Sequence, residues 1–243
     1  MFSKVFSFLL VLGALCALFS AAFFSQVYHW DAIWAYRQVF LNGWYTTIGL
    51  ALASLVLSLI IGVVASLMRQ SKLLPLRYLS QIYIEIIRGT PLLVQLLFFF
   101  YVVAASAHIQ NRYLVGVLTL SIFSGAYIAE ILRAGIENTR KTLLESAYSI
   151  GLTKPQTYRF VIFPIAFRQI LPPLAGQFAS IIKDSSLLSI LGISEFTYAA
   201  QQISSATFST LECYFPLAVG YLILTLPISL FSRYLERRTK HEA

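Results

Sequence analysis

The stretch from Glu145 to Pro164 has the sequence ESAYSIGLTKPQTYRFVIFP, which is polar, charged and rich in turn-forming residues. Long runs of aliphatic and aromatic side chains lie on both sides of it. Such a stretch belongs in water, whereas its flanks belong in an apolar environment. The sequence therefore predicts an aqueous element between membrane-embedded segments.

Composition supports a membrane protein. Of the 243 residues 58% are hydrophobic and only 12% are charged, against roughly 25% charged residues in a typical soluble domain. The two cysteines, Cys16 and Cys213, have no closely spaced partners, so neither a disulfide framework nor a zinc site is supported. We expect an all-α integral membrane bundle.

Six segments are long enough to cross a hydrocarbon core of ~30 Å, which takes ~20 apolar residues as helix. They are Val5 to Phe24, Gly43 to Met68, Ile82 to Ala107, Tyr113 to Ile136, Leu171 to Ile193 and Tyr214 to Phe231. The first could be a cleaved signal peptide, because small residues follow its apolar run. Its length favours a retained span.

Positive charge predicts the orientation, because cytoplasmic loops carry the excess of Lys and Arg. With six alternating spans, 15 of the 18 basic residues fall in inside segments or at inner span ends. Arg37 and Arg112 lie outside, and Lys183 lies within a span. Both termini are expected in the cytoplasm. The net charge of +8 is then explained by topology and anionic lipid, without nucleic acid.

Local patterns divide the opening stretch into two short helices. T-x-x-E at 142–145 and T-x-x-Q at 153–156 both predict a helix start. Gly151 is placed to end the first helix in a left-handed conformation, and Pro164 to close the second. Periodicity alone leaves two interpretations open, an amphipathic hairpin on lipid or a docking element for a cytoplasmic partner.

The stretch resembles the loop E-A-A-x3-G-x9-I-x-L-P of ABC-transporter permease subunits. Glu145, Ala147, Gly151 and Pro164 match it in register, while Ser146, Val161 and Phe163 replace other small or apolar residues. The resemblance implies that this loop, within residues 137–164, couples the chain to an ATPase subunit.

Three further stretches resemble the polar-amino-acid importer branch of that family. They are YIEIIRGTPLLVQL at 83–96, AYIAEILRAGI at 126–136 and IIKDSSLLSILGISEF at 181–196. Thr142 and Leu143 depart from the usual Gly-Gln before the loop glutamate. The resemblance implies a five-helix type I importer permease core at 43–238, with one extra span and a periplasmic segment at 1–42.

The implied function is that of a permease subunit in an ATP-driven, binding-protein-dependent importer of a polar amino acid in the bacterial inner membrane. Its implied partners are a pair of ATPase subunits, an external amino-acid-binding protein and a second, identical or related permease chain. ATP and Mg²⁺ are expected on the ATPase, with no cofactor and no enzyme activity in this chain, because G-x4-G-K-[ST] is absent.

Two other classes remain as alternatives. An ion-gradient-driven secondary transporter would need coupling-ion sites and commonly shows internal repeats, of which we find none clear. A membrane scaffold that transports nothing has no reason to keep charges in its spans. The three histidines, His29, His108 and His241, are far apart, and no metal-binding pattern is present.

Two charged pairs at i, i+3 spacing are predicted to be structural. Glu130 and Arg133 lie near the inner end of their span, where they are expected to bond to each other. Glu85 and Arg88 precede Gly89-Thr90-Pro91, where an ion pair at a broken helix is favoured over a role in transport.

Lys183, Asp184, Ser185 and Ser186 are the candidates for the substrate path. Counted from Leu171, they fall ~18 Å into a predicted span, near the bilayer midplane. Their charges and hydroxyls complement the ammonium and carboxylate of an amino acid. The alternative is that each charge pairs with another helix or subunit to stabilise packing.

Overall fold

The computed structural model describes Gly13 and residues 30–241 of the chain. Within this part the chain is helical and contains no strand. The elements are α2 (Trp30–Ala35), α3 (Arg37–Arg69), α4 (Leu74–Gly89), α5 (Leu92–Phe98), the π-helix η1 (Phe99–Ala104), α6 (Arg112–Ser149), α7 (Lys154–Thr157), the π-helix η2 (Tyr158–Ile162), α8 (Phe163–Asp184), the 3₁₀-helix η3 (Ser185–Leu191), α9 (Phe196–Thr207) and α10 (Thr210–His241).

Three of the described helices are long and apolar enough to cross a membrane. They are α3, the part of α6 from Arg112 to Glu137, and the part of α10 from Thr210 to Arg238. They contain the spans predicted at 43–68, 113–136 and 214–231. The predicted span from Val5 to Phe24 lies outside the described residues, Gly13 apart.

The span predicted from Ile82 to Ala107 is not one straight helix. The chain enters it at Leu74 as α4 and bends by 109° before continuing as α5 and η1. Pro91 has no N–H to donate, and Thr90 before it is extended with φ −123° and ψ 147°. The pair forms either a broken span or a re-entrant loop.

The span predicted from Leu171 to Ile193 is also different. α8 already begins at Phe163, and it ends at Asp184, where the chain tightens into η3. Gly192 follows η3 in the left-handed conformation, with φ 68°. A 3₁₀ turn closed by a left-handed glycine ends the regular helix well before the last apolar residue.

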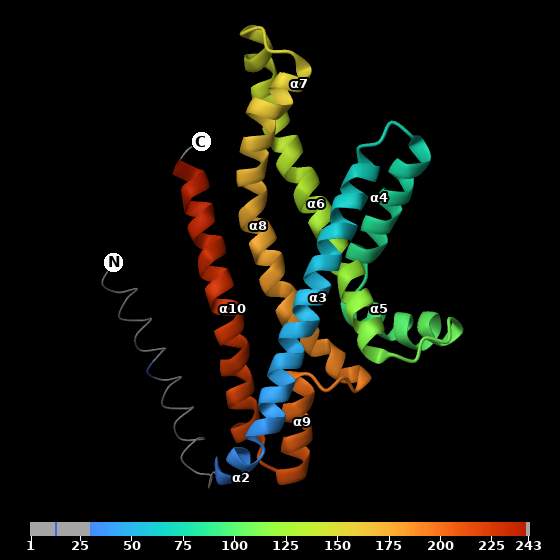
Figure 1. The fold of residues 1–243 in the computed structure, drawn as a ribbon, viewed down its shortest axis with the longest axis vertical. Coiled ribbons are helices and arrows are strands. Elements are labelled where there is room, and N and C mark those ends of the chain that lie inside the picture. Colours follow the sequence, from blue (N-terminus) through green and yellow to red (C-terminus); the bar gives the residue numbers. More distant parts are fainter. Residues whose placement is uncertain (1–12, 14–29, 242–243) are drawn as a thin grey trace.

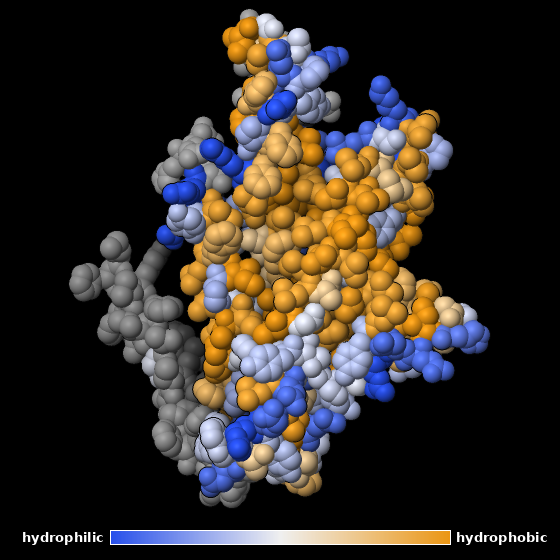
Figure 2. Space-filling model, viewed as in Figure 1, coloured by the Kyte–Doolittle hydropathy of each residue, from blue (hydrophilic) through white to orange (hydrophobic). Residues whose placement is uncertain are grey.

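Several connections between the helices lie at the two ends of the structure (Figure 1). One end carries the turn between α3 and α4, the tip of the hairpin formed by α6 and α7, and the carboxyl end of α10; α2 and α9 lie at the other end. In Figure 2 hydrophobic side chains cover the middle of the visible face, and hydrophilic ones gather towards both ends. This is the distribution expected of a bundle that spans a bilayer.

The main packing contact joins α3 and α6, and small residues allow their close approach. A Cβ on Gly62 would lie 2.5 Å from Ile128 Cγ2, and one on Gly125 would lie 2.7 Å from Ile61 Cγ2. In lipid, helices associate chiefly through such close packing, because water supplies no hydrophobic driving force. This contact holds the long helix that leads into the hairpin.

Candidate coupling hairpin and ligand path

The first arm of the hairpin is the end of α6. α6 runs without interruption to Ser149, so the helix start predicted at 142–145 is wrong; these residues lie inside a helix that began at Arg112. Gly151 has φ +82°, and the Leu152 N–H donates to the Ala147 carbonyl at 3.1 Å. These two features form the glycine-based helix end that the sequence predicts.

The second arm starts with the predicted capping box. The backbone N–H of Thr153 donates to Oε1 of Gln156 at 2.9 Å, and Pro155 lies in the first turn of α7. The prediction that Pro164 closes this arm is wrong. Pro164 lies in the first turn of α8. The wider turns of η2 precede it and accommodate its missing N–H, so the helical path continues to Asp184.

The residues that match the coupling loop lie around this hairpin. Ala147 is buried on the first arm, Gly151 is exposed at the tip, and Pro164 is exposed on the second arm. The side chains of Glu145 and Ser146 lie outside the described part of the structure, although their backbone is helical. One 38-residue helix thus runs from Arg112 into the candidate coupling element.

Glu130 is the centre of an ion-pair cluster on α6. It pairs with Arg133 on the same helix, with Arg69 at the end of α3 at 3.5 Å and with Arg88 at the end of α4 at 3.9 Å. Arg133 also pairs with Glu137. The predicted contact between Glu130 and Arg133 is present, but the carboxylate also joins three helices, which i, i+3 spacing cannot reveal.

Glu85 and Arg88 do not form the predicted pair. Among the described ion pairs none joins the two; Oε1 of Glu85 accepts from Gln81 Nε2 at 2.9 Å, and Arg88 approaches Glu130. The guanidinium of Arg88 also lies over the Tyr127 ring, 5.3 Å from its centroid. α6 therefore supplies the partners of Arg88 that the sequence alone assigns to α4.

The four candidates for the substrate path lie together where α8 becomes η3. Lys183 is exposed, Asp184 and Ser186 are partly buried, and Ser185 is buried with its hydroxyl donating to the Ile182 carbonyl at 2.8 Å. Within the described chain, neither Lys183 nor Asp184 has a salt bridge or a side-chain hydrogen bond. An internal packing pair, one of the two predicted alternatives, is therefore not found in this part of the chain.

Glu195, just before α9, is a fully buried residue for which the sequence patterns predict no role. Its carboxyl accepts from the backbone N–H of Thr197 and Tyr198, at 2.9 and 2.8 Å, and from the hydroxyls of Tyr221 and Thr47, at 3.0 and 3.3 Å. Burial raises the pKa of Glu195, against the effect of these hydrogen bonds. An acidic residue just before an amphipathic helix is the sequence signal for such a cap.

Gln95 is a second residue whose role the sequence patterns do not predict. Its Nε2 donates to the Ile87 carbonyl at 2.7 Å and to the Thr90 hydroxyl at 2.8 Å, which ties the end of α4 to α5 across the break. Freed backbone groups inside a membrane need such partners. A glutamine four residues after the Pro91 break is the feature in the sequence that could have indicated it.

No group of three or more His, Cys, Asp or Glu side chains that could hold a metal ion is present among the described residues. The Glu130 cluster and the end of α8 instead carry arginines, a lysine and carboxylates. Such groups can bind ions and zwitterions without a metal.

Comparison with known proteins identifies the family. Residues 54–241 match the model of the binding-protein-dependent transport system inner membrane component. The chain is 36% identical over 215 residues to the glutamine transport system permease protein GlnP of Escherichia coli K12, which covers 88% of this chain and 98% of GlnP. It is 37% identical over 211 residues to the L-cystine transport system permease protein TcyB of Bacillus subtilis 168, covering 86% and 90%.

A solved amino acid ABC transporter crystallised with histidines has the same fold. Its matching chain has a TM-score of 0.80 and 34% identity, covering 88% of this chain and all of that one. The MetNI methionine transporter shares the fold alone, with a TM-score of 0.67 at 15% identity. On these grounds, and with the hairpin in place at the end of α6, the chain belongs to the family of binding-protein-dependent transport system inner membrane components.

Proposed function

We propose that this chain is the permease subunit of an ATP-driven importer that moves a polar amino acid inward across the cytoplasmic membrane. The hairpin of α6 and α7 is the observation that carries the proposal. It projects from the apolar body at the end that holds the α3–α4 turn (Figure 1), and its residues match the coupling loop of ABC permeases. A projecting element continuous with a membrane helix is suited to transmit movement from a cytoplasmic ATPase.

The proposed partners follow from this assignment. A pair of ATPase subunits binds the hairpins and holds ATP and Mg²⁺, a binding protein delivers the amino acid from outside, and a second permease chain completes the path. The apolar stretch of α10 that is long enough for a span is only 6% buried within the described part of the chain. Much of its surface is therefore left for lipid or for a second chain.

The proposed orientation places both termini in the cytoplasm. Its support is that basic residues gather at the hairpin end: Arg69 and Lys72 at the α3–α4 turn, Lys154 and Arg159 in the hairpin, and Arg237 near the end of α10. The positive excess belongs on the cytoplasmic side.

The proposed substrate is a polar α-amino acid, since relatives of this chain are named for glutamine and cystine transport. Lys183, Asp184, Ser185 and Ser186 are proposed to line the path. They lie where α8 ends and the 3₁₀-helix η3 begins. In transporters, substrate and ion sites are typically formed at such interruptions of a helix. This arrangement suits a ligand that carries both an ammonium and a carboxylate.

Uptake by proteoliposomes tests this function. The chain is co-expressed with the ATPase, the second permease and the binding protein encoded beside it, and the purified complex is given each labelled amino acid in turn. We expect uptake of a polar amino acid that needs internal ATP and external binding protein together. Uptake that survives without ATP but is abolished by collapsing the ion gradient would instead establish a secondary transporter.

A further inference from the structure

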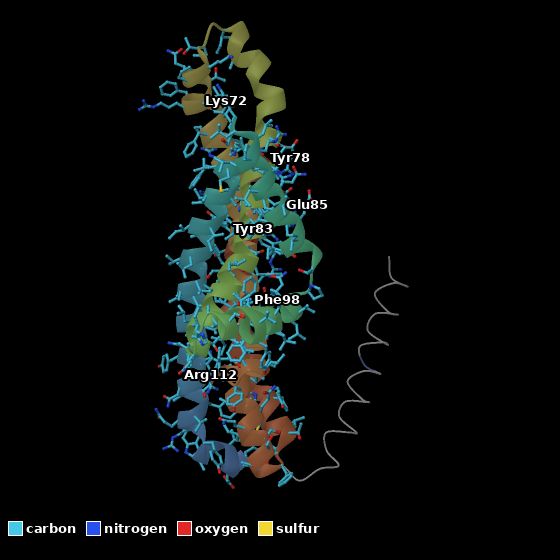
Figure 3. The ribbon with its side chains drawn as sticks, turned by 90° about the vertical axis from the view of Figure 1, so that its right-hand side faces the viewer. Lys72, Tyr78, Tyr83, Glu85, Phe98 and Arg112 are labelled. Carbon is cyan, nitrogen blue, oxygen red and sulfur yellow. The ribbon has the colours of Figure 1, made fainter. Side chains whose placement is uncertain are left out.

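Four polar side chains form a strip along α4, which we call the α4 strip: Tyr78, Gln81, Glu85 and Arg88. Their spacing of three or four residues places them on one face of the helix. Tyr78, Glu85 and Arg88 are exposed and Gln81 is partly exposed. Figure 3 shows Tyr78 and Glu85 on the outer side of α4, whereas Tyr83 lies towards the bundle, where its hydroxyl donates to the Ile122 carbonyl.

The charged part of this strip lies at membrane depth. α4 begins at Leu74, beside the basic turn that follows α3. At ~1.5 Å per residue, Glu85 lies about 17 Å and Arg88 about 21 Å along the helix from that start. The hydrocarbon core is ~30 Å thick, so neither side chain can face lipid without a large cost. The strip must therefore face water or another protein surface.

The break after α4 leads to the same conclusion independently. Gly89, Thr90 and Pro91 are non-helical or at the helix end, and all three are exposed. A Cβ on Gly89 would meet nothing within 4 Å. Irregular backbone at membrane depth is tolerated only where protein covers it or a water-filled cavity reaches it.

Both charges keep free bonding capacity. Within the described part of the chain Glu85 accepts one hydrogen bond, from Gln81, and a carboxylate has room for several. Arg88 stands 3.9 Å from Glu130 and over the Tyr127 ring, but 41% of its side chain is exposed. Its guanidinium has five N–H donors in a planar fork that matches a carboxylate. Glu130 and Tyr127 of α6 thus contact one side of the Arg88 guanidinium, and part of the side chain stays exposed.

We propose that Glu85 and Arg88 bind the zwitterionic head of the transported amino acid, with its ammonium on Glu85 and its carboxylate on Arg88. Side chains at i, i+3 start about 5–6 Å apart, close enough for both to reach groups attached to one carbon atom. The proposal rests on the proposed function. Residues 183–186, where α8 passes into η3, then form another position on the path.

Ligand analogues separate this role from a structural one. The complete complex of permease chains and ATPase is purified into lipid nanodiscs without the binding protein. Equilibrium binding is measured for three probes: L-glutamine, 4-aminobutanamide, which lacks its carboxylate, and glutaramic acid, which lacks its ammonium. Each variant is then compared with wild type for every probe.

The expected result is a selective loss. Arg88→Gln should weaken L-glutamine and glutaramic acid by about tenfold or more, as for a lost charge-assisted hydrogen bond, and leave 4-aminobutanamide unchanged. Glu85→Gln should weaken L-glutamine and 4-aminobutanamide and spare glutaramic acid. Arg88→Lys should retain part of the glutaramic acid affinity, and Lys72→Gln, at the exposed inner turn, should change none of the three.

Three outcomes would overturn the proposal. One is an equal loss for all probes, and another is failure of every Arg88 and Glu85 variant to assemble, which would make the pair a contact with the second permease chain. The third is a wild-type complex that imports L-glutamine with the binding protein present but binds no probe without it. If the complex imports another amino acid, the same comparison is made with that amino acid, with its analogue that lacks the carboxylate and with its analogue that lacks the ammonium. ATP-dependent uptake by wild type decides the proposed function separately.

Discussion

Gly151 shows how one residue sets the geometry of the hairpin. Its φ of +82° is open to glycine but strained for residues with a Cβ, although a Cβ there would touch nothing within 4 Å. The obstacle to substitution is therefore the backbone conformation and not the available space. The turn places α7 back against α6, so a distorted turn would change the surface that the hairpin offers to the proposed ATPase partner.

We predict graded effects of substitution at Gly151. Gly151→Asn should retain most of the ATPase stimulation by the loaded binding protein, since Asn tolerates the left-handed region. Gly151→Ala should lose part of the stimulation, because alanine in the left-handed conformation costs ~1–2 kcal/mol. Gly151→Pro should lose the stimulation entirely, because Pro is locked near φ −65°. Membrane insertion should be normal in all three. Stimulation at the wild-type level in all three variants would show that the hairpin tip plays no part in coupling.

Lys183 and Asp184 give a second prediction at the residue scale. Asp184→Asn and Lys183→Met should each lower the uptake rate by about 10- to 100-fold, the range for one charge-assisted hydrogen bond. The double variant distinguishes substrate binding from pairing with another subunit. A double variant that assembles but does not import supports the path; full uptake by the double variant would exclude both residues from substrate handling.

At the scale of elements, Glu130 connects the helix that forms the hairpin to the two helices beside it. Its carboxylate is 21% exposed and neutralises arginines from α3, α4 and α6. Tyr83 adds a hydrogen bond of 2.6 Å from α4 to the α6 backbone, and Ser80 one of 2.7 Å to the α3 backbone. We infer that α3, α4 and α6 move together when the hairpin moves.

Removal of the Glu130 carboxylate should weaken the packing of α3, α4 and α6 against one another. We predict that Glu130→Gln lowers the stability of the complex by ~1.5–3 kcal/mol, because three arginines lose their shared anion. Glu137→Gln is the matched control: its side chain is 57% exposed and, among the described residues, its ion-pair partner is Arg133 alone, so a loss below ~1 kcal/mol is expected. Thermal unfolding in detergent measures both, and equal shifts would contradict a special role for Glu130.

At the scale of the whole molecule, the arrangement makes topology testable at its two ends. In a chain with Cys16→Ser and Cys213→Ser, Lys72→Cys lies at the turn after α3 and Gln202→Cys lies on α9; both positions are exposed. We predict that a membrane-impermeant maleimide added outside spheroplasts labels Gln202→Cys alone, and that Lys72→Cys reacts only after lysis. The opposite pattern would reverse the proposed orientation.

The sequence determined the class of this protein and the greater part of its spans. Transfer of apolar side chains from water is a local and nearly additive property, so runs of ~20 such residues located α3, the apolar part of α6 and α10 directly. Local chemistry also sufficed for the helix end at Gly151 and for the capping box at Thr153, because both depend on residues within a few positions of each other. The family resemblance rests on the same short-range patterns.

Only the tertiary structure decided where the helices break and which charges meet. The bend after Gly89 is stabilised through Gln95, and the end of α8 depends on packing of η3 against α3, α6 and α9. Glu130 collects arginines from two other helices, and Glu195 accepts from Thr47, 148 positions away in the chain. Such pairings are decided by geometry across the fold, because desolvation makes each buried charge take whichever partner packing brings close. A pattern within one segment cannot contain that information.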